Sequence, residues 1–162
     1  MDQKEKVYEK LNKLNIAYEV TDHPAVYTIE EMDDLGITEK GDVCKNLFLR
    51  DEKGKRHFLV VLEKDKKADL KNIQKQLGCT RLSFASAERL DKYLKLEKGE
   101  VTPLGVINDK DCAVEVVFDN DLKGKTRLGV HPNDNTATVW ISFEDVKKVI
   151  DNNGNKIKYV TI

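Results

Sequence analysis

Apolar residues along the chain follow patterns that switch between the period of a helix and the period of a strand. Val7, Leu11 and Leu14 recur at helical spacing and predict a first helix over residues 2–14, followed by an extended segment over residues 16–21. In the first half of the chain, the remaining pattern predicts a short helix after a capping box that starts at Thr28, strands over 44–50 and 56–62, and a helix that carries Leu70, Ile73 and Leu77 and ends at Gly78. A short strand over 81–84, a helix capped by Ser86 and a loop over 99–105 follow. The rest of the chain predicts strands over 106–107, 112–118 and 136–141, a helix capped by Ser142, and a final strand over 156–162. Helices and strands are mixed without a regular βαβ repeat.

The strands predicted over residues 44–50 and 56–62 are apolar on both faces, and the polar segment from Asp51 to Lys55 joins them as a hairpin. Strands of this kind lie in the middle of a sheet that is covered on both sides. We therefore expect an α/β fold of the α+β type, with a mixed central β-sheet flanked by helices. The length of 162 residues fits one domain over residues 1–162, and no internal repeat or linker divides the chain.

Charge and composition narrow the classes of function. The chain has 28 Lys and Arg against 29 Asp and Glu, for a net charge of -1, so we expect any contact with nucleic acid to be a local patch. The charged N-terminal segment lacks the apolar core of a signal peptide, and no apolar run is long enough to cross a bilayer, so we expect a cytoplasmic protein that binds no membrane. Cys44, Cys79 and Cys112 form no CxxC pair, which predicts reduced thiols, and nothing in the sequence requires a metal or an organic cofactor.

Lys45 is the most informative single residue, because no familiar catalytic motif occurs in the chain. Alternation along its strand places Lys45 on the same face as Leu47 and Leu49, which are expected core positions. Two interpretations stay open: a strand-end lysine that reaches water or pairs with a carboxylate, or a cation at the mouth of a pocket. The neighbouring Cys44 has no histidine or acid at a recognisable spacing, so we expect a buried thiol rather than a nucleophile.

A second candidate is the segment from Leu128 to Thr136, whose glycine, proline, asparagine and aspartate residues predict a tight loop. Its backbone N–H groups, the ring of His131 and the amide of Asn135 are suited to bind a carbonyl oxygen, an amine or a phosphate. An ordinary hairpin is the other interpretation. A local excess of lysines is a candidate for phosphate contact, although a solvated helix face explains such clusters more often: Lys64, Lys66, Lys67, Lys71 and Lys75.

Several short motifs occur together, in this order: His23-Pro24, Thr28-Ile29-Glu30-Glu31, Cys44-Lys45-Asn46-Leu47-Phe48-Leu49-Arg50-Asp51, Val101-Thr102-Pro103-Leu104-Gly105, Gly129-Val130-His131-Pro132-Asn133 and Asn135-Thr136-Ala137-Thr138-Val139. With these motifs the chain resembles the YbaK/ProX family of aminoacyl-tRNA deacylases over nearly its full length. The asparagine after the strand lysine and the Gly-Val-His-Pro sequence resemble the free-standing branch that removes alanine. The order and spacing of the motifs make a chance similarity improbable.

The resemblance implies the compact fold of the editing domain that is inserted in bacterial-type prolyl-tRNA synthetases, here acting in trans. The implied activity is hydrolysis of the aminoacyl ester of mischarged tRNA(Pro), chiefly Ala-tRNA(Pro), since a synthetase pocket shaped for proline loses only about 1–3 kcal/mol per methylene that alanine lacks. The implied partners are the acceptor end of tRNA(Pro) and, as a further candidate, prolyl-tRNA synthetase. Two alternatives stay open, a Cys-tRNA(Pro) deacylase of the same superfamily and a non-catalytic module that binds aminoacyl-tRNA or an amino acid.

The resemblance also implies roles for individual residues. Lys45 matches the essential lysine of the family, and its ammonium would hold the terminal adenosine or its phosphate. The residues implied to bind the substrate follow by motif position: Asn46, Gly129, Val130, His131, Pro132, Asn135 and Thr136. Backbone N–H groups of the 129–132 segment are the implied donors to the oxyanion. No side chain is an evident general base, which fits a family mechanism with a positioned water and the ribose hydroxyl of the substrate.

Overall fold

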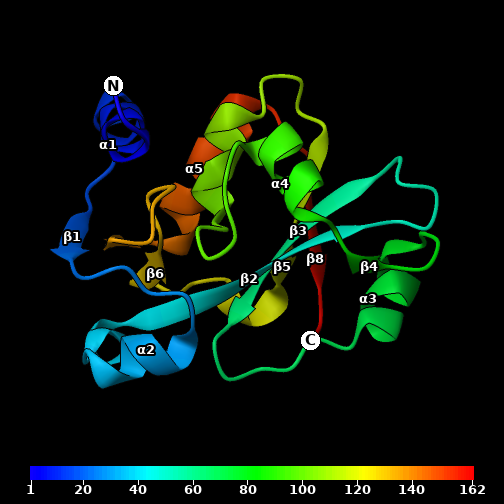
Figure 1. Ribbon diagram of the computed structural model, residues 1–162, viewed down its shortest axis with the longest axis horizontal. Coiled ribbons are helices and arrows are strands. Elements are labelled where there is room, and N and C mark those ends of the chain that lie inside the picture. Colours follow the sequence, from blue (N-terminus) through cyan, green and yellow to red (C-terminus); the bar gives the residue numbers. More distant parts are fainter.

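The computed structural model describes residues 1–162 and has a mixed α/β fold, in which helices pack around one eight-stranded sheet (Figure 1). The elements follow in this order: α1 (Gln3–Lys13), β1 (Glu19–Asp22), α2 (Ile29–Asp34), η1 (Ile37–Lys40), β2 (Asp42–Arg50), β3 (His57–Glu63), α3 (Leu70–Leu77), β4 (Ser83–Phe84), α4 (Ala87–Leu94), η2 (Pro103–Asn108), β5 (Val114–Asp119), η3 (Asn120–Leu122), β6 (Leu128–Val130), β7 (Ala137–Ile141), α5 (Phe143–Asn153) and β8 (Ile157–Val160), where η denotes a 3-10 helix. This arrangement confirms the predicted fold class, a mixed sheet with flanking helices.

The sheet has the strand order β1-β7-β6-β2-β3-β5-β8, and β4 also pairs with β2. β2 and β3 form the predicted antiparallel hairpin, in register from Cys44 opposite Glu63 to Arg50 opposite His57. β5 is parallel to β3 and β8 is parallel to β5, whereas β6, β7 and β1 extend the sheet on the other side of β2. β3 is therefore a central strand, which explains its unbroken run of buried residues from His57 to Leu62.

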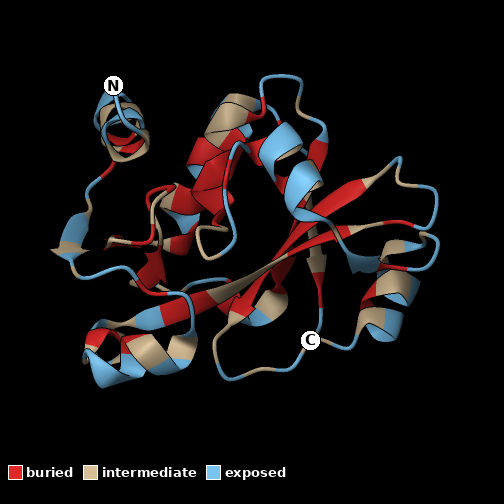
Figure 2. Cartoon of the chain, in the orientation of Figure 1, coloured by how far each residue is buried: buried red, intermediate tan, exposed pale blue.

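Two of the three clusters of buried side chains cover the two faces of the sheet's centre. The larger cluster joins α1, α4 and α5 to the face that carries Leu59 and Val116, and the smaller cluster joins Ile73 of α3 to the face that carries Leu49 and Val60. Buried residues follow the central strands and α5 in Figure 2, while exposed residues gather on the outer helices. Burial of both faces confirms that the two-sided apolar strands lie in the centre of the sheet.

Local sequence signals set the ends of several helices as predicted. The hydroxyls of Thr28, Ser86 and Ser142 each accept a hydrogen bond from the backbone N–H three residues ahead and so cap α2, α4 and α5. Gly78 ends α3 at a φ of 66°, a left-handed conformation that glycine adopts without steric cost. These capping predictions are confirmed. Each cap depends only on residues that are close in the sequence, so the sequence alone is enough to predict it.

Two predictions in the second half of the chain need correction. The predicted strand over residues 106–107 is wrong, because both residues lie in η2, which begins with the cap Thr102 and with Pro103 at its first position. η2 packs against α4 and α5, and these tertiary contacts override the strand preference of Val106. The second correction is β6, which lies within the segment from Leu128 to Thr136 where the sequence predicts a loop. The sequence does not reveal this strand, because three residues with a central glycine, Gly129, carry no strand pattern.

His57, at the start of β3, is a buried histidine that the fold holds neutral. It is 1% exposed, its ring lies against Tyr93 with centroids 4.0 Å apart, and its Nε2 lies 3.0 Å from Nη1 of Arg89. A guanidinium only donates, so Nε2 accepts and carries no proton. Burial, and then the charge of Arg89, lower the pKa of His57 to about 4.

We predict that His57 makes the protein less stable in mild acid. The unfolded chain binds a proton at His57 near pH 6.5, whereas the folded chain binds it only near pH 4. The contribution of neutral His57 to the free energy of unfolding is therefore complete above pH 6.5 and is lost as the pH falls from 6.5 to 4. At pH 5 the expected loss is about 2 kcal/mol. Urea unfolding at pH 7 and pH 5 measures it against His57→Gln, which keeps an acceptor for Arg89. An equal loss in both proteins would contradict the prediction.

Candidate functional site

The candidate site lies where one edge of β2 has no strand partner. β6 pairs with β2 only at Asp42–Val43, and β4 pairs with it only at Leu49–Arg50. Between these two contacts, Cys44–Phe48 borders an open pocket of about 580 Å³. The pocket therefore fills a gap in the sheet, and β2 forms its floor.

The rest of the lining comes from segments that are distant in sequence. They are the chain leading into α2, the β4–α4 region, the 98–101 segment and His131. Of 18 lining residues, 12 are hydrophobic, and the charged ones are Lys45 and Lys98, with no aspartate or glutamate among them. A chain with 29 acidic residues thus leaves this pocket free of carboxylates, which favours a ligand with negative charge.

The backbone of β2 offers polar groups to the gap. The N–H of Asp42 donates to Arg127, and the C=O of Phe48 accepts from Ala85, so the even-numbered residues direct their main-chain groups towards this edge. Asn46 is an even-numbered residue between Asp42 and Phe48, and its N–H and C=O therefore face the pocket. A main-chain N–H in this position is a suitable donor to an oxyanion.

Side chains from both faces of β2 reach the pocket because it lies at the strand's edge. Cys44 and Phe48 belong to the larger core cluster, so Asn46 points to that face. Lys45 lies on the opposite face with Leu47 and Leu49, which contribute to the smaller cluster, as alternation predicts. Burial raises the pKa of the Cys44 thiol to about 12, which makes it inert as a nucleophile, as expected.

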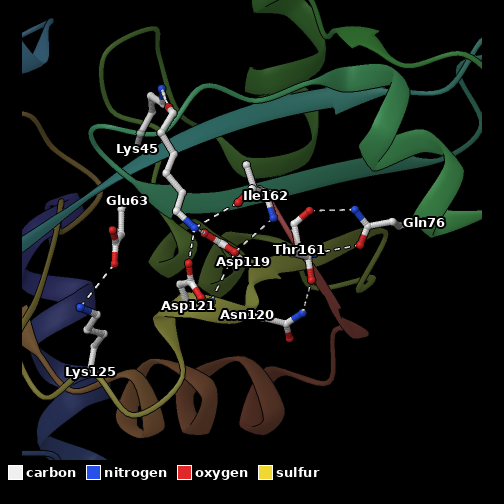
Figure 3. Close-up of polar contacts among 10 residues, drawn as sticks. Lys45, Glu63, Gln76, Asp119, Asn120, Asp121, Lys125, Thr161 and Ile162 are labelled. Carbon is white, nitrogen blue, oxygen red and sulfur yellow. Dashed lines mark hydrogen bonds and ion pairs between the residues drawn. The ribbon is translucent and has the colours of Figure 1, made fainter.

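The ammonium of Lys45 binds the turn that follows β3, and contacts with residues at the end of β5, in η3 and at the C-terminus fix this turn in place. Lys45 Nζ donates to the backbone oxygen of Lys66. Lys66 Nζ in turn lies 2.6 Å from Oδ2 of Asp119, whose side chain is fully buried, and also contacts Asp121 and the backbone oxygen of Ile162. Figure 3 labels these three partners of Lys66. Lys66 is thus occupied by ion pairs and is not free for the phosphate contact considered for the lysine cluster.

Asn46 and His131 place two hydrogen-bond acceptors at the same end of the pocket. Asn46 Oδ1 is buried and has no partner within the chain. Nδ1 of His131 lies 3.1 Å from the carbonyl oxygen of Ala137, which can only accept, so Nδ1 carries the proton. Burial lowers the pKa of His131, which leaves Nε2 an unprotonated acceptor at neutral pH. Each of these two neutral acceptors can accept a hydrogen bond from an ammonium group.

The other predicted binding residues divide into two groups. Gly129 and Val130 lie in β6 and line a small cavity of about 10 Å³ between Asn46 and His131. A Cβ on Gly129 would lie 2.7 Å from the Trp140 ring, so this position requires glycine. Pro132, Asn135 and Thr136 line neither space.

Asn135 and Thr136 contact the surroundings of the pocket instead. Asn135 Nδ2 donates to the backbone oxygen of Val26 at 2.9 Å and thereby fixes the segment before α2. Thr136 Oγ1 donates to Asp134 and accepts from Lys4 of α1. These contacts indicate that both residues support the pocket rather than touch what it holds.

Tyr27, Phe84 and Lys98 also line the pocket, and none of them belongs to a motif that the sequence indicates. Their exposure and convergence are tertiary properties, and no local pattern marks them.

No group of three or more His, Cys, Asp or Glu side chains is placed to bind a metal ion. None of the helices combines the length and apolarity that crossing a bilayer requires.

Comparison with known proteins identifies the family and the fold of the chain. Residues 23–149 match the aminoacyl-tRNA editing domain family. The chain belongs to this family. It is 52% identical over 162 residues to the prolyl-tRNA editing protein ProX of Acetoanaerobium sticklandii, covering 100% of this chain and 99% of the relative, and 35% identical to prolyl-tRNA synthetase associated domain-containing protein 1 of Danio rerio, covering 93% and 83%.

A solved structure described as a candidate trans-editing enzyme for prolyl tRNA synthetase has the same fold. Its TM-score is 0.75 at 19% identity, over 100% of this chain and 98% of that chain. The family membership confirms the resemblance that the motifs carry. In this editing domain, the motif that contains Lys45 and Asn46 forms the pocket floor, and the motif that contains His131 closes its inner end.

We predict that Lys66 is a strong contributor to stability. Lys66→Met leaves the buried carboxylate of Asp119 without its cation and should lower the free energy of unfolding by about 3 kcal/mol or more. The exposed neighbour Lys67 provides the control, because Lys67→Met should change it by less than about 0.5 kcal/mol. Urea unfolding at pH 7 compares the two variants. Equal losses of free energy of unfolding would mean that the Lys66–Asp119 pair contributes no more to stability than an exposed lysine does.

Proposed function

We propose that this editing domain hydrolyses the ester of mischarged tRNA(Pro), chiefly Ala-tRNA(Pro), in trans. The observation that carries the proposal is the pair of neutral acceptors, Asn46 Oδ1 and His131 Nε2, at the inner end of a pocket without carboxylates. The 52% identity to a prolyl-tRNA editing protein over the full chain supports tRNA(Pro) as the substrate. Aminoacyl-tRNA is made in the cytoplasm, where we place the protein, and prolyl-tRNA synthetase is the candidate partner that supplies the substrate.

The two acceptors would bind the α-ammonium group of the aminoacyl moiety. An aminoacyl ester carries this group next to its carbonyl carbon, whereas the tRNA chain carries only phosphate charge. Asn46 Oδ1 is costly to bury without a partner, and an ammonium donor would satisfy it. The neutral ring of His131 accepts through Nε2 and does not repel the cation.

The small cavity between Asn46 and His131 supports alanine as the amino acid. Its space of about 10 Å³ holds roughly one water-sized or methyl-sized group. An alanine side chain fits there once the ammonium is bound, and a pyrrolidine ring does not. A cavity of this size would provide the second sieve that a proline-shaped synthetase pocket needs.

In the proposed reaction, water attacks the ester carbonyl and the 3′ oxygen of the ribose leaves with a proton, giving free alanine and uncharged tRNA. The main-chain N–H of Asn46 faces the pocket and would stabilise the developing oxyanion. Lys45 would leave the backbone oxygen of Lys66 and hold the terminal adenosine or its phosphate, which fixes the ester in place. The water is positioned by the substrate's ribose hydroxyl rather than by a general base.

The deciding measurement compares the hydrolysis rates of Ala-tRNA(Pro), Cys-tRNA(Pro) and Pro-tRNA(Pro) by the purified protein. We expect fast loss of alanine and little loss of proline. Lys45→Ala should lower kcat/KM for alanine at least about 100-fold, because the ester is no longer held. Its free energy of unfolding should stay within about 1 kcal/mol of wild type, since the lysine is partly exposed.

Lys110→Ala is the matched control, since this exposed lysine lies outside the pocket lining and the lysine cluster, and it should leave the rate unchanged. Faster loss of cysteine would replace alanine with the Cys-tRNA(Pro) alternative. A folded protein that hydrolyses none of the esters would support the non-catalytic binding module. Unfolding of Lys45→Ala would give this lysine a structural role.

The pH profile tests the role of His131. Protonation of His131 would turn an acceptor into a cation, so the rate should fall on the acid side, below the ordinary histidine pKa of 6.5, because burial lowers the pKa of this ring. His131→Gln keeps a neutral acceptor and should lose this acid limb, with a rate reduction of about tenfold that is milder than for Lys45→Ala. Rates between pH 5 and pH 8 compare both proteins. An unchanged acid limb in the variant would show that another group titrates.

A further inference from the structure

Two exposed aromatic rings stand at the rim of the pocket. The exposed large hydrophobic residues of the chain are Met1, Val20, Tyr27, Leu35 and Phe84. Tyr27 is 66% exposed and Phe84 is 64% exposed, and both line the pocket. A single exposed hydrophobic residue is ordinary, but two aromatic rings from distant segments at one pocket indicate a ligand with flat apolar faces.

The backbone holds both rings in place. Tyr27 packs against Gly99, which has a φ of +92°, and a Cβ at that glycine would lie 2.8 Å from Cδ1 of Tyr27. Phe84 lies in β4, which is fixed by its pairing with Leu49 of β2 and by the adjacent hydrogen bond to Phe48. Rings that are placed before a ligand arrives lose little freedom on binding, which favours stacking.

The charge and size of the pocket identify what the rings contact. Lys98 is exposed and lines the pocket beside Gly99, and no carboxylate lines the space. The volume of about 580 Å³ is far larger than an alanyl group needs and lies in the range of sites that hold a nucleoside. A ligand that combines flat rings with negative charge is a nucleotide, and unpaired RNA bases are commonly bound by stacking on aromatic side chains.

We propose that Tyr27 and Phe84 stack on the unpaired bases at the 3′ end of the tRNA acceptor, and that Lys98 contacts a phosphate of the same segment. The inference rests on the proposed function, which places the aminoacyl group at Asn46 and His131. The bases then lie over the outer part of the pocket. Stacking accepts any base, so this rim holds the acceptor end and leaves the choice of amino acid to the inner cavity.

Steady-state kinetics with Ala-tRNA(Pro) test the stacking. Tyr27→Ala and Phe84→Ala should each raise KM at least about fivefold and change kcat less than about twofold, because stacking holds the tRNA without touching the ester. Tyr27→Phe and Phe84→Tyr should restore KM. Val20→Ala removes an exposed side chain away from the pocket and should change neither constant. Unchanged KM in both alanine variants would overturn the proposal and leave the rings as a contact for a protein partner.

Salt dependence tests the phosphate contact. Lys98→Ala should reduce the slope of log(kcat/KM) against log salt concentration by about 0.7, the value for one phosphate of a single strand. Lys110→Ala provides the control, since Lys110 is exposed, does not line the pocket and does not belong to the lysine cluster; it should leave the slope unchanged. An unaltered slope for Lys98→Ala would remove this residue from the proposal.

Binding of the trinucleotide CCA separates this inference from the proposed function, because CCA carries no ester. Titration is followed by NMR of the aromatic side chains in wild type and in Phe84→Ala. Shifts of the Tyr27 and Phe84 rings, with binding weakened at least about fivefold in the variant, support the inference even where no ester is hydrolysed. Hydrolysis of Ala-tRNA(Pro) without any CCA binding or KM effect would contradict the inference and leave the proposed function standing.

Discussion

The incomplete pairing of β2 is the constraint on which the site depends. β3 pairs with β2 along its length, while β6 and β4 reach only the two ends of the other edge. Backbone polar groups left at such an edge need partners, and a wet pocket supplies them where a packed core would not. The main chain of Asn46 is therefore accessible in the middle of a sheet, on a floor that β3 keeps rigid. A pocket built on loops alone would hold its donors less firmly.

The position of Lys45 depends on contacts that span most of the chain. Its ammonium rests on the backbone of Lys66, and Lys66 is held by the buried carboxylate of Asp119 at the end of β5. β5 is in turn paired with β3 and β8. The lysine is thus aligned by the half of the sheet opposite to the half that carries His131. A substrate that binds both residues spans the gap and takes its geometry from both halves.

How far the sequence predicts this structure depends on the range of each interaction. The capping residues Thr28, Ser86 and Ser142 act on neighbours within three residues, and their helices are predicted correctly. Val106 is locally suited to a strand but packs in η2 against distant helices, and β6 is too short to leave a pattern. Lys66 resembles its neighbours in a lysine cluster, and only the fold reveals Asp119 as its partner. The site motifs are recognisable together, while the exposed rings of the rim are not.

The near-zero net charge of the protein agrees with the proposed recognition of RNA. Charges more than about 8 Å from the pocket are largely screened at physiological salt. For binding in the pocket, the absence of carboxylates from the lining therefore matters more than the net charge of the protein. Few phosphate contacts mean that general attraction to tRNA is weak, and affinity then depends on the ester end. Hydrolysis removes the ammonium group that Asn46 and His131 are proposed to bind. The uncharged tRNA consequently loses contacts that the substrate had, which favours release of the product and lets a weakly charged protein turn over.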